Sequence, residues 1–97
     1  MKISKEIWID EKVKWNALRK RTLEKKNFYK GQAYMVCTSP NPKLLFEIIE
    51  AKYIGSRYED CVLLAVCKHK KQAVERVRIL VDQLYNQKCK TYEALLE

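Results

Sequence analysis

The apolar residues of the chain follow two different periods, and the change of period predicts where strands and helices lie. In residues 60–68 apolar side chains occupy both alternating sets, which is typical of a strand that is covered on both faces. The second cover of such a strand must come from another helix of the chain or from a second protomer. In residues 70–86 apolar residues recur every three or four positions, which predicts an amphipathic helix.

A second strand and a second helix are predicted between residues 31 and 52. Residues 31–38 are partly β-branched or aromatic, and two prolines follow them closely. Asn41 is a natural helix N-cap and Pro42 suits the first helical position, so a helix is expected over 42–52. Its expected buried stripe consists of Leu44, Leu45, Ile48, Ile49 and Ala51.

The two ends of the chain have weaker patterns. Residues 10–27 predict a helix capped by Asp10. Its apolar stripe is narrow and consists of Trp8, Trp15, Leu18 and Thr22. Residues 3–9 fit either a strand or an extended arm, and residues 90–97 fit a short terminal helix.

Together these elements predict an α+β or small α/β fold in the order α-β-α-β-α, with two layers and a small sheet of two or three strands. If the 42–52 helix is a crossover, the two central strands are parallel; an antiparallel pair with a helical excursion is the alternative. We expect one domain over residues 1–97. Within it we distinguish a basic N-terminal helical arm (1–30), a βαβα core (31–86) and a C-terminal tail or short helix (87–97).

Size and composition narrow the class of protein. A chain of 97 residues with 47% apolar and 33% charged residues builds one core and has little room for a deep substrate cleft. Its longest apolar run, residues 61–67, is far shorter than the roughly 20 residues of a membrane span. No signal peptide is apparent, so we expect a cytoplasmic protein. We expect the four cysteines, at 37, 61, 67 and 89, to be reduced and mainly buried.

The patterns that carry known chemistry are absent or weak. Cys67 and His69 are close in sequence, but no third group is evident to orient the imidazole. The cysteine spacing does not fit a zinc site, and two glycines are too few for a phosphate-binding loop. Glu47 and Glu50 are best explained as the solvated face of a helix. We therefore expect a protein that is not an enzyme and has no cofactor or metal.

The positive charge is concentrated near the N-terminus. The net charge is +8, and residues 1–30 contain ten Lys and Arg against four acids, a net of +6. Such density attracts phosphates of nucleic acids. The start of the 70–86 helix, with nearby lysines, is a second candidate anion site. The candidate contact residues are Lys12, Lys14, Arg19, Lys20, Arg21, Lys25 and Lys26 in the first segment, which also contains Lys30, and Lys68, Lys70 and Lys71 in the second.

Two functional hypotheses follow from these features. The first is a nucleic-acid-associated accessory or regulatory protein that holds phosphates with the basic segments. The second is a homodimeric protein–protein interaction module, suggested by the two-sided apolar strand and by Phe46, Tyr53 and Ile79, which lie off the main stripes. An acidic protein partner would explain the same charge without nucleic acid.

Overall fold

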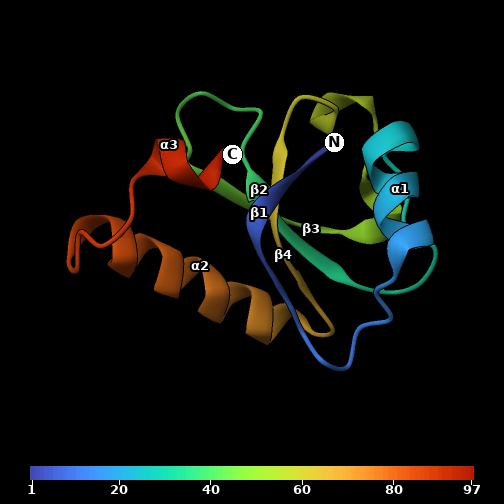
Figure 1. The fold of residues 1–97 in the computed structure, drawn as a ribbon, viewed down its shortest axis with the longest axis horizontal. Coiled ribbons are helices and arrows are strands. Elements are labelled where there is room, and N and C mark those ends of the chain that lie inside the picture. Colours follow the sequence, from blue (N-terminus) through green and yellow to red (C-terminus); the bar gives the residue numbers. More distant parts are fainter.

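A four-stranded mixed sheet lies at the centre of the computed structural model, which describes all of residues 1–97 (Figure 1). The strands are β1 (Lys2–Ile9), β2 (Tyr34–Thr38), β3 (Phe46–Glu50) and β4 (Val62–Cys67). The helices are α1 (Ala17–Lys26), α2 (Lys70–Tyr85) and α3 (Tyr92–Leu95), with short 3-10 turns at Ala51–Tyr53 and Ser56–Tyr58. The mixed α+β class is confirmed, but the element order and the number of strands differ from the prediction.

The strand pairing brings distant parts of the chain together. The sheet order is β1-β4-β2-β3, so the first and last strands are neighbours and run parallel. β2 is antiparallel to both β3 and β4. The parallel pairing of 31–38 with 60–68, expected if the 42–52 helix were a crossover, is therefore wrong, because the segment between them is not a crossover helix.

The helix expected over 42–52 is instead a turn followed by an edge strand. Asn41 begins a helix-like turn, since its side-chain oxygen accepts a hydrogen bond from the Lys43 N–H at 3.0 Å. The turn then ends, and Ile48 and Ile49 pair with Val36 and Met35 of β2. The edge of the sheet offers hydrogen bonds and apolar neighbours that a short helix here would lack, so tertiary context overrides the local signal.

The burial of β4 on both faces is confirmed. Every residue of β4 is buried, and its side chains divide between two apolar clusters on opposite faces of the sheet. A bulge at Leu64 interrupts the alternation, because Val36 and Cys37 of β2 pair with Ala65 and Leu63. As a result Val66, which strict alternation would place on the face of Leu64, lies on the opposite face.

Helices cover both faces of the sheet, so the fold has three layers rather than the two expected. Figure 1 shows α2 and α3 on one side and α1 on the other. We call the two apolar clusters the α2-side cluster, which includes Leu80 and Leu95, and the α1-side cluster, which includes Leu23 and Tyr29. The whole two-sided cover of β4 thus comes from its own chain.

The predicted 70–86 helix corresponds to α2, and the expected short terminal helix corresponds to α3. The buried stripe of α2 is centred on Ala73 and Leu80, whereas Val74, Val81 and Tyr85 are exposed. No helix of the structure combines the length and apolar character that a membrane crossing requires.

Residues 1–30 do not form a separate arm. β1 is an edge strand of the sheet, and α1 packs on the sheet through Leu23, which is fully buried. The helix begins at Ala17, where Asn16 rather than Asp10 is the cap: its side chain accepts a hydrogen bond from the Arg19 N–H at 2.9 Å. Leu18, expected on the docking stripe, is exposed.

Candidate functional site

A basic pocket of about 340 Å³ lies where four segments meet on the α1 side of the molecule. The segments are the β1–α1 loop, the first turn of α1, the α1–β2 loop and the residue after β4. Each segment contributes at least one cation, and no acidic residue lines the pocket. We call this the basic pocket; its cations are Lys12, Lys14, Arg19, Lys30 and Lys68.

The buried carboxylate of Asp10 connects two of these segments. One of its oxygens accepts a hydrogen bond from the Lys12 N–H at 3.2 Å, and the other accepts from the Lys68 N–H at 3.1 Å. Hydrogen bonding from the Lys12 N–H is the main cause that lowers the pKa of Asp10, against the opposing effect of burial. Asp10 therefore stays ionised and holds the β1–α1 loop against the end of β4.

Tyr29 anchors the other side of the basic pocket. Its hydroxyl donates a hydrogen bond to the Lys14 carbonyl at 2.6 Å, and its ring stacks with Trp15 at a centroid distance of 6.4 Å. The Arg19 guanidinium lies 5.8 Å from the Tyr29 ring centroid and donates through Nε to the Lys30 carbonyl at 3.1 Å. These contacts fix three of the cation-bearing segments relative to one another.

The cations of the basic pocket form no ion pair with an acidic side chain, although the carboxylate of Asp10 interacts electrostatically with Lys12. The three ion pairs of the protein are Lys52–Glu50, Arg78–Glu75 and Lys90–Glu6, and none of them includes a cation of the pocket. Like charges held together repel one another, and this cost is relieved when an anion binds among them. The arrangement is therefore suited to an anionic ligand.

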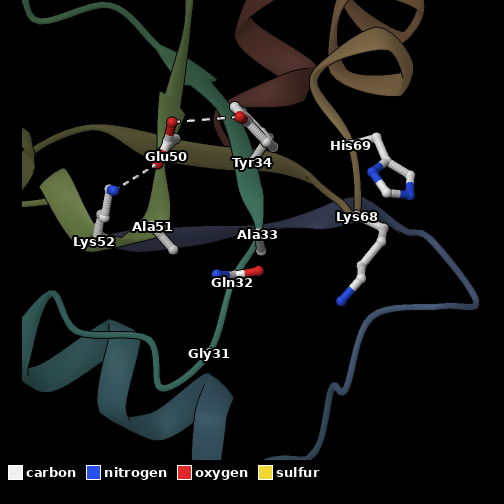
Figure 2. Close-up of a pocket in the computed structure, with 9 residues that line it drawn as sticks. All are labelled: Gly31, Gln32, Ala33, Tyr34, Glu50, Ala51, Lys52, Lys68 and His69. Atoms are coloured by element: carbon white, nitrogen blue, oxygen red, sulfur yellow. Dashed lines mark hydrogen bonds and ion pairs between the residues drawn. The ribbon is translucent and has the colours of Figure 1, made fainter.

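A second hollow of about 300 Å³ adjoins the basic pocket and shares Gly31, Gln32 and Lys68 with it. Figure 2 shows the Lys68 side chain extending from the end of β4 toward the Gly31–Gln32 segment. On another wall Glu50 accepts a hydrogen bond from the Tyr34 hydroxyl and pairs with Lys52. This hollow has mixed charge, so the excess of positive charge lies in the basic pocket.

The structure brings together only part of the predicted contact set. Lys12, Lys14, Arg19 and Lys68 line the basic pocket, together with Lys30. The other predicted cations are exposed and lie outside it. They are Lys20, Arg21, Lys25 and Lys26 on α1, and Lys70 and Lys71 in the first turn of α2.

At the start of α2, the second predicted anion site, two backbone N–H groups already donate hydrogen bonds to side chains of the protein. The Gln72 side-chain oxygen accepts a hydrogen bond from the His69 N–H at 3.2 Å. Asp10 already accepts from the Lys68 N–H one residue earlier. Of this group only Lys68 contributes to the basic pocket.

Gly31 and Gln32 are pocket residues that the sequence did not single out. Gly31 has a φ of +127°, a conformation that other residues rarely adopt. A Cβ at this position would lie 3.4 Å from the Tyr29 ring. One of only two glycines in the chain, directly after Lys30, was the available signal.

The cysteine thiols and the Glu47–Glu50 pair, the other candidate groups, are buried or hydrogen-bonded within the fold. Burial is the main cause that raises the pKa of the Cys67 thiol to about 11, and that of Cys37 to about 12. Glu47 is not on a solvated helix face as expected. It lies in β3, and its carboxylate accepts hydrogen bonds from the hydroxyls of Ser39 and Tyr58. The pair formed by Glu47 and Glu50 thus lies on a strand, with each carboxylate bound to different partners.

Comparison with known proteins adds no relative to this description. No protein-family model, no curated protein and no solved structure matches the chain.

Proposed function

We propose that the protein binds nucleic acid through the basic pocket and acts as a non-enzymatic accessory or regulatory protein. The observation that carries the proposal is the convergence of Lys12, Lys14, Arg19, Lys30 and Lys68 on one pocket without any acidic residue. Lysine and arginine are the side chains that most often hold phosphate groups.

The ligand favoured by this pocket is a chain of closely spaced anions. A nucleic acid carries a phosphate on every nucleotide, so one strand can place several charges among five neighbouring cations. Binding releases the counterions of those phosphates, which makes affinity strong at low salt. The cations of α1 outside the pocket add long-range attraction, which salt screens over about 10 Å at 0.1 M.

The homodimer hypothesis loses its main motivating observation, although Tyr53, one of the residues that suggested a partner, is exposed. Both faces of β4 are covered within the chain, by the α1-side and α2-side clusters. Phe46, one of the residues that suggested a partner, packs against Tyr92 with ring centroids 6.1 Å apart. The basic pocket is therefore the better basis for a function.

A cytoplasmic location is part of the proposal. Three of the four cysteines are free and buried inside the core, where thiols act as small apolar groups. Such a core suits a reducing compartment.

The test compares two variants that remove the same charge from different places. The pocket variant carries Lys14→Gln, Lys30→Gln and Lys68→Gln, and the matched helix variant carries Lys20→Gln, Lys25→Gln and Lys26→Gln. Affinity for fluorescently labelled oligonucleotides is measured by anisotropy at about 50 mM salt, where phosphate contacts are strongest. We expect the pocket variant to lose at least about tenfold in affinity and the helix variant to lose much less.

Three results would contradict the proposal. The wild-type protein could show no binding, or the two variants could lose affinity equally, in which case only total charge matters. Polyglutamate could also displace the protein as well as an oligonucleotide of equal charge does, which would indicate an acidic protein partner.

A further inference from the structure

We infer that the ligand of the basic pocket is single-stranded, and that Phe28 and Leu18 form a platform on which an unpaired base stacks. This inference rests on the proposed function and specifies its substrate class. Phe28 is 55% exposed and Leu18 is 69% exposed, although both are large apolar side chains. They line a hollow of about 310 Å³ beside the basic pocket.

The two hollows share their cations. Arg19 and Lys30 line both the basic pocket and the hollow of Phe28 and Leu18, in which Thr22 is the remaining residue. A phosphate held at Arg19 and Lys30 would therefore lie next to an apolar surface. A single strand offers this pair of groups side by side, a charged phosphate and a base with a free face.

The backbone presents Phe28 in a defined way. Asn27 ends α1 in the left-handed conformation, with a φ of 51°, while its N–H donates to the Leu23 carbonyl at 3.1 Å. After this turn Phe28 points to solvent, and Tyr29 is buried and stacked on Trp15. Phe28 therefore lies between a capped helix end and an anchored residue. Because the backbone on both sides is already held in place, binding of a base to Phe28 costs little additional conformational entropy.

A duplex fits this surface less well. Its bases are paired and stacked on each other, so an aromatic ring beside a phosphate site would face the sugar–phosphate backbone. Stacking of a base on an aromatic ring is open to unpaired bases and is tolerant of sequence. We therefore expect single-strand preference with little sequence specificity.

The experiment combines a change in the protein with a change in the ligand. Wild type, Phe28→Ala and Phe28→Tyr are titrated by anisotropy with an oligothymidylate of about ten nucleotides, a length that covers one small binding site. The same titrations use an abasic strand of equal length, which keeps the phosphates and lacks the bases, and a duplex. Tyr85→Ala, which removes a ring that is 58% exposed on the other side of the sheet, is the matched control.

We expect Phe28→Ala to weaken binding of the oligothymidylate by about 5- to 150-fold, the range for loss of one stacked base. Phe28→Tyr keeps the ring and should keep the affinity. Binding of the abasic strand and of the duplex should not respond to Phe28→Ala, and Tyr85→Ala should change nothing. Matching ribo- and deoxyribo-strands identify the preferred sugar, and stronger binding of either over the duplex supports the inference.

Two failures can be told apart. In the first, the pocket variant abolishes binding, but Phe28→Ala either weakens binding of the abasic strand and of the oligothymidylate equally or weakens binding of neither strand. The inference is then wrong and the proposed function stands. In the second, the pocket variant binds nucleic acid as tightly as the helix variant does. The proposed function is then wrong, and the inference that rests on it is wrong as well.

Discussion

The two faces of the sheet are built differently. On the α2 side, an amphipathic helix and α3 pack on apolar side chains such as Val36 and Leu64, and the apolar pattern is sufficient to explain the contact. On the α1 side the helix has little amphipathicity, and Leu23 is its one buried residue. Most of the apolar cluster on that side comes from strands and loops, for example Met35 and Leu63. Polar contacts of Asp10 and Tyr29 hold the loops next to the basic pocket.

This difference suggests a division of labour within a small domain. Apolar burial on both sides stabilises the fold without involving charge, and on the α2 side it is the main contact between helix and sheet. The α1 side positions cations that repel one another, so it needs fixed polar contacts to keep its loops together. If this account is right, mutations on the two sides should separate stability from binding.

The largest expected effects come from truncating a buried helix leucine on each side of the sheet. Leu80→Ala and Leu23→Ala should each lower the free energy of unfolding by about 2–5 kcal/mol, because each leaves a cavity in a packed cluster. Chemical denaturation monitored by tryptophan fluorescence measures both. Only Leu23→Ala should also weaken nucleic-acid binding, since α1 carries Arg19 of the basic pocket.

Binding is compared without denaturant, at a temperature at which both variants are folded. Equal losses of affinity in Leu80→Ala and Leu23→Ala would contradict the separation of the two sides. A loss of stability below about 1 kcal/mol in either would show that the cluster has been assigned wrongly.

Asp10→Asn should have the next largest effect. It replaces a charged acceptor of two backbone N–H groups by a neutral amide, and we expect a loss of about 1.5–3 kcal/mol near pH 7. Because the pKa of Asp10 is lowered in the folded state, its stabilisation is present above the unfolded value of about 3.9 and disappears as pH falls through the folded pKa.

The measurement is the free energy of unfolding at several pH values between about 7 and 2. The difference between wild type and Asp10→Asn should shrink toward the acid end. Glu11→Gln, at the exposed neighbouring position, is the control and should leave stability unchanged near pH 7. A difference that stays constant over the whole range would show that the charge of Asp10 is not what holds the two loops.

Tyr29→Phe is expected to have the smallest effect on stability. It removes only the hydroxyl that donates to the Lys14 carbonyl, at a cost of about 0.5–1.5 kcal/mol, and keeps the ring stacked on Trp15. The released β1–α1 loop should weaken oligonucleotide binding by a few-fold. Tyr53→Phe, at an exposed ring, should change neither quantity; a wild-type affinity in Tyr29→Phe would mean that Lys14 needs no fixed position.

The sequence predicts the α2 side better than the α1 side, for physical reasons. Residues 60–68 and 70–86 have strong periodic patterns, and both elements are present with nearly those bounds. Residues 42–52 carry a local helix signal at Asn41 and Pro42 that pairing with β2 overrides. The bulge at Leu64 depends on the register of neighbouring strands, which no single segment encodes.

The basic pocket could be predicted only in part. The density of charge identified the segment of Lys12, Lys14, Arg19 and Lys30, and it suggested Lys68 separately. That Lys68 lies beside Lys12 follows from the parallel pairing of β1 with β4 and from Asp10, which are contacts over more than fifty residues of chain. The choice among the remaining cations likewise depends on which face of α1 meets the sheet.

The most direct test of the central claim is the salt dependence of binding. For single strands, the slope of log affinity against log salt falls by about 0.7 for each phosphate contact that is lost. We predict that the pocket variant, which lacks three of the five cations, has a slope about 2 units shallower than wild type, and that the helix variant keeps a nearly wild-type slope. Equal slopes for the wild type and the pocket variant would show that the basic pocket does not hold phosphates.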